Sequence, residues 1–171
     1  MNYITLDKLI KDLELETIYR ADNIEEEKIT ASEMNRPGLQ FAGFFDKFAY
    51  ERLQVLGNVE WNYSNDLPRD IRYNRFERIF EYPIPAMVIA RDLEVFPELI
   101  ELGKKYNRSI FRTPCSTTKF INTLINYLDY QLAPSTTVHG VLVEVYGMGI
   151  LIMGKSGVGK SETALELIKR G

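Results

Sequence analysis

Hydrophobic residues near the start of the chain repeat at the spacing of one face of an α-helix. They are Leu6, Leu9, Ile10 and Leu13. Thr5 precedes them and can accept a hydrogen bond from the first helical turn, so we expect a helix that begins after Thr5. Residues 16–20 then alternate like a short strand, and we expect Ile29-Thr30 to pair with it.

From residue 51 onward, the pattern alternates between buried strands and helices. The apolar runs that predict strands are 51–56, 86–90 and 109–112. Helical spacing covers 67–80, 97–106 and a segment from Ser116 or Thr117 to about Gln131. Elements that alternate in this way form parallel strand pairs through right-handed crossovers. Residues 1–131 are therefore predicted to form an N-terminal α/β domain with a mostly parallel sheet and flanking helices.

A change of pattern near residue 132 predicts a second domain. Residues 132–137 combine proline with small polar residues after a helix end, which is typical of a linker. Within 138–171, apolar segments at 138–146 and 150–153 flank Gly147-Met148-Gly149 and predict a hairpin. A helix is expected over 162–170, with Gly171 as its C-cap.

Composition and charge narrow the class of protein. Of 171 residues, 45% are hydrophobic and 12% aromatic, which is enough for a packed core. The 21 basic and 24 acidic residues give a net charge of −3, so the chain as a whole has no electrostatic attraction to nucleic acid or to an anionic membrane. The single Cys115 excludes an internal disulfide, and no apolar run reaches membrane-spanning length. With no secretory signal at Met1-Asn2-Tyr3, we expect a soluble cytoplasmic protein.

Three clusters of residues allow two interpretations each. An aromatic cluster over residues 41–50 could stack on a ligand, but such residues more often form a core or a subunit interface, and we favour that role. The arginine-rich helix over 67–80 could suggest RNA, but acidic neighbours balance it and favour a charged solvent face. The acidic run Glu25-Glu26-Glu27 could bind a metal, although a solvated turn is more usual. The aromatic residues are Phe41, Phe44, Phe45, Phe48 and Tyr50, and the arginines are Arg69, Arg72, Arg75 and Arg78.

The stretch Gly154-Lys155-Ser156-Gly157-Val158-Gly159-Lys160-Ser161 fits the phosphate-binding pattern G-x-x-x-x-G-K-[ST] at every fixed position. Glycines allow consecutive backbone N–H groups to point into one anion-binding concavity. Lys160 would reach the β- and γ-phosphates of ATP, and the Ser161 hydroxyl would ligate Mg²⁺. An apolar strand before the loop and a helix after it would place the phosphates on a helix N-terminus. The alternative is a glycine-rich turn without a ligand.

His139 is the only histidine of the chain, and hairpin geometry predicts its position. If the hairpin turns at Gly147-Met148, cross-strand pairing places His139 opposite about Ser156, beside the phosphate loop. A lone histidine usually has a structural role, but imidazole can also contact phosphate or carry a proton near neutral pH. Cys115 has no histidine nearby in the sequence, and we interpret it as structural.

These segments resemble the bacterial HPr kinase/phosphorylase family. The resemblance is most specific between Ala133 and Leu167, and it extends over essentially the whole chain. The matching segments are 133–143, Tyr146-Gly147 and 154–167, together with 35–38, 41–44, 52–57 and 90–92.

The resemblance implies a homo-hexameric cytoplasmic transferase, a serine kinase that controls carbon catabolite repression. With Mg²⁺ and ATP, such an enzyme phosphorylates a serine of HPr, the phosphocarrier protein of the sugar phosphotransferase system. With inorganic phosphate it reverses the modification and forms pyrophosphate. By the same resemblance, Gly154 to Ser161 is the nucleotide site, Ser161 the Mg²⁺ ligand, and His139 and Lys160 active-site residues.

The resemblance also implies that these residues hold an N-terminal domain and only the start of a P-loop kinase domain. The family's general acid/base is an aspartate a few residues beyond Gly171. We therefore expect residues 1–171 alone to be inactive, because phosphoryl transfer to a hydroxyl needs a proton acceptor. The alternatives are a non-catalytic regulatory or assembly module and an unrelated P-loop NTPase. The latter is disfavoured because the loop follows a hairpin and an entire preceding domain.

Overall fold

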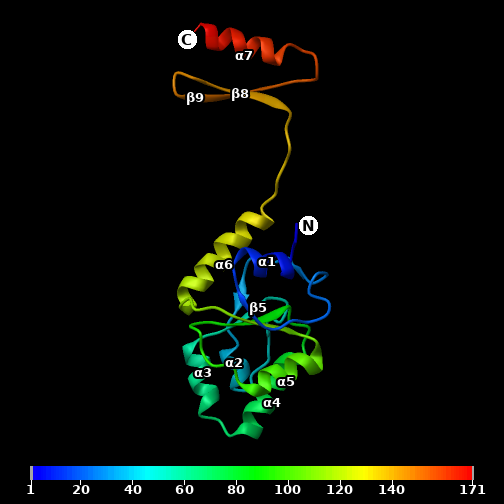
Figure 1. Ribbon diagram of the computed structural model, residues 1–171, viewed down its shortest axis with the longest axis vertical. Coiled ribbons are helices and arrows are strands. Elements are labelled where there is room, and N and C mark those ends of the chain that lie inside the picture. The colour runs from blue at the N-terminus through cyan, green and yellow to red at the C-terminus, as the bar shows by residue number, and fades with distance from the viewer. Residues whose placement is uncertain (1, 171) are drawn as a thin grey trace. The chain divides into compact units, whose positions relative to one another are not determined.

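The computed structural model describes residues 2–170, which divide into two compact units between Ala133 and Pro134. Gly171, expected as a helix cap, lies outside the described residues. The first unit is built around a five-stranded sheet with the order β2-β7-β6-β5-β4 (Figure 1). Its strands are β2 (Glu16–Tyr19), β7 (Ser109–Arg112), β6 (Ala86–Ile89), β5 (Leu53–Leu56) and β4 (Met34–Asn35). Strands β4 to β7 are parallel and β2 is antiparallel to β7, so the mostly parallel α/β sheet is confirmed.

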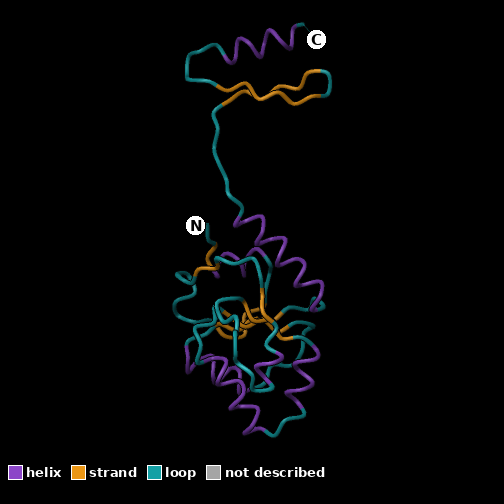
Figure 2. The backbone as a smooth tube through the Cα atoms, turned by 180° about the vertical axis from the view of Figure 1, so that it is seen from behind, coloured by secondary structure: helices purple, strands orange, loops and turns teal. Residues whose placement is uncertain are grey.

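Helices cover both faces of this sheet, as the tube in Figure 2 shows from behind. Helices α1 (Leu6–Asp12) and α6 (Thr117–Leu132) cover one face. The other face is covered by α2 (Gly38–Phe41), α4 (Arg69–Phe80) and α5 (Pro97–Tyr106). Helix α3 (Asn58–Asn65) lies between β5 and α4 in the chain. None of the helices described within residues 2–170 is both long and apolar enough to cross a membrane.

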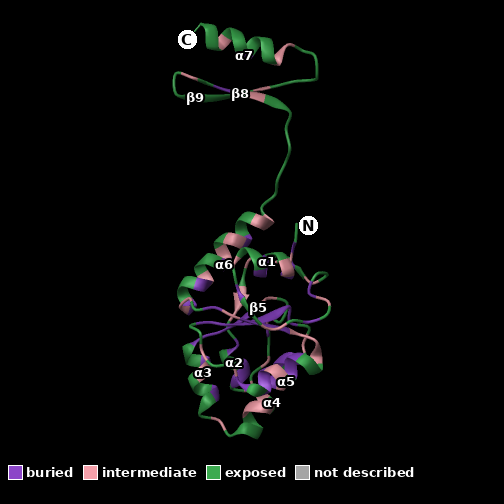
Figure 3. Ribbon diagram, viewed as in Figure 1, coloured by how far each residue is buried: buried purple, intermediate pink, exposed green. Residues whose placement is uncertain are grey.

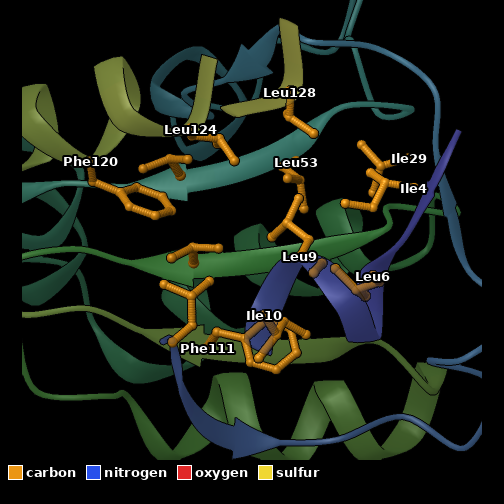
Figure 4. Packing of buried hydrophobic residues seen from close by; sticks show 14 of the residues in the cluster. Ile4, Leu6, Leu9, Ile10, Ile29, Leu53, Phe111, Phe120, Leu124 and Leu128 are labelled. Carbon is orange, nitrogen blue, oxygen red and sulfur yellow. The ribbon is translucent and has the colours of Figure 1, made fainter. Parts of the chain in front are cut away.

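Alternate residues of each strand supply the two hydrophobic cores. On one face, Leu53 and Phe111 meet Leu9 of α1 and Leu124 of α6 (Figure 4). On the other face, Met87 and Ile110 pack with the helix residues of α4 and α5. Because both faces are buried, the strands have the near-continuous apolar sequences that parallel sheets require.

The pairing expected for Ile29-Thr30 is wrong. Strand β3 (Lys28–Ile29) pairs antiparallel with β1 (Ile4–Thr5), whereas β2 pairs with β7. Ile4 and Ile29 are opposite each other and both are buried in the first core, which accounts for this choice. The helix cap at Thr5 is confirmed, since its side chain accepts a hydrogen bond from the Lys8 N–H at 3.4 Å.

Helix α3 was not predicted from the sequence. Its sequence is polar, and only Glu60 and Ser64 are buried. The Glu60 carboxylate accepts a hydrogen bond from the Gly57 N–H at 3.1 Å and an ion pair from Arg36 at 2.8 Å. These polar contacts, together with Trp61, which packs against the second core and stacks on Phe96, hold the helix in place without an apolar stripe.

The arginine-rich helix α4 is only partly the charged solvent face expected for it. Arg69 is exposed, but Arg72 is largely buried and its Nη2 donates to Glu98 Oε1 at 2.7 Å. In the aromatic cluster, Phe41 and Phe48 are core residues, whereas Phe44 is exposed. Cys115 is half-buried and packs against the first core.

The second unit contains a hairpin and one helix. Strands β8 (Gly140–Val145) and β9 (Met148–Met153) are antiparallel, and α7 (Lys160–Lys169) follows the loop after β9. Residues 133–139, which precede β8, contain neither helix nor strand. Helix α7 packs mainly on β8, through the buried residues Ala164 and Val143.

Candidate functional site

The hairpin turns one position earlier than the sequence predicts. Its turn residues are Tyr146 and Gly147, with φ of 52° and 76°, the two positive values that a type I′ turn requires. Gly140 therefore pairs with Met153, and His139, one residue before, lies nearest Gly154 in register. The expected position opposite Ser156 is wrong by two residues, because tyrosine is an unusual residue at positive φ and the turn was assigned to Gly147-Met148.

The loop after β9 has the backbone geometry of an anion cradle. Gly157 and Gly159 have φ of 80° and 90°, conformations that L side chains rarely adopt. Gly159 is the N-cap of α7 and provides no side-chain cap, so the first N–H groups of the helix remain available to a ligand. The loop therefore fits the phosphate groups of a nucleotide, with the positive end of the α7 dipole behind them.

Lys160 is the first residue of α7, and its side chain turns back onto the loop. Its Nζ donates to the carbonyl oxygens of Gly154 and Lys155, both at 2.8 Å. An ammonium group has three donors, so these bonds leave one for a ligand. A Cβ at Gly154 would lie 2.9 Å from Val158 Cγ1, so a side chain there would require Val158 to move. The lysine thus holds the loop in shape and brings a positive charge to it.

A cleft of about 570 Å³ brings the predicted site residues together. Its lining comes from the start of the hairpin, from the loop after β9 and from the first residue of α7. The lining residues are His139, Gly140, Gly154, Lys155, Ser156 and Lys160. Gly140 was not predicted as a site residue, but a Cβ there would lie 2.9 Å from the Ile152 carbonyl oxygen. Its only sequence signal is its place beside His139.

No carboxylate is among the lining residues of this cleft. From Pro134 to Arg170 the chain has three glutamates, Glu144, Glu162 and Glu166, and four lysine or arginine residues. Arg170 Nε donates to Glu166 Oε1 at 2.9 Å, so Glu166 pairs with Arg170 and not with the lysines of the cleft. The site is therefore positively charged within a chain of net charge −3.

The chain offers fewer groups that could bind Mg²⁺ than groups that could bind phosphate. Ser161 is exposed in the first turn of α7, where its hydroxyl can serve as one ligand. Within residues 2–170, no group of three or more His, Cys, Asp or Glu side chains could hold a metal ion. Mg²⁺ in nucleotide sites takes most of its oxygen ligands from phosphates and water. The described residues are compatible with one protein ligand, Ser161.

Comparisons with known proteins identify two matching families. The family described as HPr Serine kinase N terminus matches residues 4–128, and that described as HPr Serine kinase C-terminal domain matches residues 130–171. An HPr kinase/phosphorylase of Caldanaerobacter subterraneus subsp. tengcongensis is 53% identical over 171 residues, which are 100% of this chain and 56% of the relative. That of Peptoclostridium acidaminophilum is 55% identical over 168 residues, 98% of this chain and 54% of the relative. The chain spans about half the length of these curated relatives.

A solved structure is similar in fold. It contains the CBS and DRTGG domains of the regulatory region of Clostridium perfringens pyrophosphatase, complexed with the activator diadenosine tetraphosphate. The match covers 75% of this chain and 50% of the other, with a TM-score of 0.52 and 16% sequence identity. At this identity the similarity concerns the fold alone.

Proposed function

Because this chain belongs to the HPr serine kinase family, we propose that it carries the nucleotide-binding segment of a bifunctional kinase and phosphorylase that acts on HPr. Residues 1–131 are the N-terminal domain, 132–137 the linker, and 138–171 the start of the C-terminal P-loop kinase domain. The whole protein is a cytoplasmic homo-hexamer that controls carbon catabolite repression. The observation that carries the proposal is the positively charged cleft between His139 and the phosphate loop.

In the kinase direction, the serine hydroxyl oxygen of HPr attacks the γ-phosphorus of ATP. The bond from that phosphorus to the β–γ bridging oxygen breaks, ADP leaves, and the hydroxyl proton passes to a base. The N–H groups of the loop and the Lys160 ammonium bind the phosphates and stabilise the charge on them. The Ser161 hydroxyl would hold Mg²⁺, which would supply further positive charge to the phosphate oxygens.

In the phosphorylase direction, an oxygen of inorganic phosphate attacks the phosphorus of phosphoserine. The phosphorus–serine oxygen bond breaks, pyrophosphate forms, and the serine oxygen takes up a proton. The same loop and the same lysine serve both directions, because both transition states place a phosphoryl group next to a second phosphate. His139 lines the same cleft, where an imidazole can contact phosphate or carry a proton.

The first 171 residues are proposed to bind the nucleotide without completing the reaction. The cleft has no carboxylate in its lining to accept the serine proton, and the metal has one protein ligand. In the family, the general acid/base is an aspartate beyond the position of Gly171. The proposed nucleotide site therefore lies within residues 1–171, whereas phosphoryl transfer also needs that aspartate.

The test is to incubate the chain with ATP, Mg²⁺ and HPr, to weigh HPr by mass spectrometry, and to measure ATP binding by calorimetry on the same sample. We expect ATP binding and no phosphorylated HPr. Lys160→Ala should abolish measurable binding, whereas Lys169→Ala, at the far end of α7, should leave it unchanged. Failure of the wild-type chain to bind ATP contradicts the nucleotide site. Phosphorylation at a catalytic rate would place the proton acceptor within these residues, with His139 as the first candidate.

A further inference from the structure

Lys155 is a second lysine in the cleft, and the phosphate-loop pattern does not account for it. The pattern fixes Gly154, Gly159, Lys160 and Ser161, and leaves position 155 free. Lys155 lines the cleft and is exposed, and its ion pairs are absent from those described within residues 2–170. Because no carboxylate lines the cleft, the ammonium group of Lys155 is available to an anion there.

Lys160 has one ammonium donor left for the phosphate groups that it reaches. Two of its three donors already hold the carbonyl oxygens of Gly154 and Lys155. These two bonds to the backbone hold the Lys160 ammonium near the base of the loop. A second cation beside the loop would add donors for the outer of two adjacent phosphoryl groups.

Lys155 is placed to supply such a cation. It directly follows Gly154, the residue nearest His139 in the register of the hairpin, and Lys155 and His139 both line the cleft. The volume of about 570 Å³ leaves room for more than the one phosphate that the loop surrounds. Ser156, which also lines the cleft, adds a hydroxyl that can donate to an oxyanion.

We propose that Lys155 forms, with His139 of the same cleft, a second phosphate subsite that binds a phosphoryl group lying next to the one held by the loop. That group is either the terminal phosphate of a nucleotide or the second phosphate of inorganic pyrophosphate, since both present the same chemistry. The inference rests on the proposed function and assigns the residue that discriminates two adjacent phosphate groups from one.

The test compares ligands with and without the outer phosphate, by isothermal titration calorimetry of the 1–171 chain in Mg²⁺-free buffer at constant ionic strength. Pyrophosphate against inorganic phosphate measures the nucleotide-free group, and ATP against ADP measures the nucleotide-bound group. Lys155→Gln should weaken pyrophosphate or ATP binding about three- to tenfold while changing phosphate and ADP binding little, as loss of one partly exposed charge contact predicts. Lys155→Arg should restore most of the affinity, and Lys169→Gln is the matched control outside the cleft.

Each outcome decides between the alternatives. A selective loss with pyrophosphate alone, with ATP alone or with both supports the subsite and identifies the source of its phosphate. Equal losses for all four ligands, or none, overturn it, because Lys155 then acts as a general surface charge or not at all. If the wild-type chain binds phosphate and ADP but Lys155→Gln is unchanged, only this inference fails. If the wild-type chain binds none of the four, the proposed function fails together with it.

Discussion

The two units of the chain are built from the same kinds of element but bury them to different degrees (Figure 3). In the first unit, the sheet is covered on both faces, and residues such as Phe111 and Leu124 are fully buried. In the described part of the second unit, Val143 and Ala164 are the only buried hydrophobic residues. Its exposed large hydrophobic residues are Val138, Leu142, Tyr146, Met148, Ile150, Leu151, Met153, Val158, Leu165 and Ile168.

This difference shows that an apolar pattern predicts an element but not what covers it. Leu142 and Leu151 are paired across the hairpin, on the face opposite that of Val143, and Leu142 is 73% exposed. An isolated two-stranded hairpin is at best marginally stable in water, and one helix on one face adds little burial. The charged cleft therefore belongs to the less stabilised of the two units.

The largest effect that we predict is a difference in amide hydrogen exchange between the units. Amides of β6 and β7 should exchange only through global unfolding of the first unit, which costs on the order of 5 kcal/mol or more. Amides of β8 and β9 should exchange through local opening that costs no more than about 2 kcal/mol. Exchange followed by mass spectrometry of peptides from both regions measures the ratio. Equal protection in the two regions would show that they unfold as one cooperative unit, and the comparison would be wrong.

Large-to-small substitutions should give the next largest difference. Phe111→Ala removes a side chain of zero exposure from the centre of the sheet and should lower the free energy of unfolding by about 3–5 kcal/mol. Leu142→Ala should change it by no more than about 0.5 kcal/mol, because the side chain is already in water. Trp61, the single tryptophan, lies in the first unit, so urea unfolding followed by its fluorescence reports that unit. Destabilisation of this transition by Leu142→Ala would mean that the units are energetically coupled.

The buried ion pair between Arg72 and Glu98 sets a third difference, within the first unit. Glu98 is 1% exposed, so Glu98→Gln leaves the Arg72 charge without its partner and should cost about 3 kcal/mol. Glu16→Gln is the control, because Glu16 is half exposed and its bidentate pair with Arg112 should contribute no more than about 1 kcal/mol. Urea unfolding of both variants at neutral pH gives the comparison. A smaller loss for Glu98→Gln than for Glu16→Gln would contradict it.

The same pair predicts a dependence on pH. Burial raises the pKa of Glu98, but hydrogen bonds from Arg72 and from its own backbone N–H, with the charges of Arg72 and Arg69, outweigh burial and lower the pKa overall. Because the folded carboxyl ionises at lower pH, its contribution to stability is fully present above the unfolded pKa of about 4.3. It is lost as the pH falls through the folded value. The difference in unfolding free energy between the wild-type chain and Glu98→Gln should therefore shrink in acid.

The elements that the sequence predicts well are those whose pattern is local. Strand β7 and helix α5 have the bounds that the sequence indicates, because an apolar run or a proline in the first helical turn marks them. Helix α3 was missed because a single aromatic residue, Trp61, and the polar contacts of Glu60 hold it, and neither gives an apolar stripe in the sequence. The pairing of Ile29 was wrong because two-residue strands have no local register signal, and the partner is chosen by burial beside Ile4.

The candidate site divides in the same way. The phosphate loop is predictable because its glycines and lysine have fixed spacing. The register that places His139 was off by two residues, since it depends on Tyr146 adopting a positive φ. The burial of the Arg72 side chain was not predicted. The arginines of this helix recur every three residues, so the sequence does not distinguish Arg72 from the exposed Arg69, and only the fold places Glu98 beside it.

The smallest predicted effect concerns His139. It tests whether this polar residue of the second unit binds ligand, in contrast to Glu98 of the first unit, which supports the fold. His139 is exposed, precedes β8 by one residue and lines the cleft, so His139→Ala removes little packing. We expect pyrophosphate affinity to fall about threefold, as for loss of one exposed hydrogen bond, with an unchanged thermal unfolding midpoint. Thr137→Ala, two residues earlier and outside the cleft lining, should change neither quantity. A structural histidine gives the opposite result, with a lower midpoint and normal affinity per folded molecule. Calorimetric titration and thermal unfolding of the same preparations therefore decide whether His139, unlike Glu98, contributes to the ligand rather than to the fold.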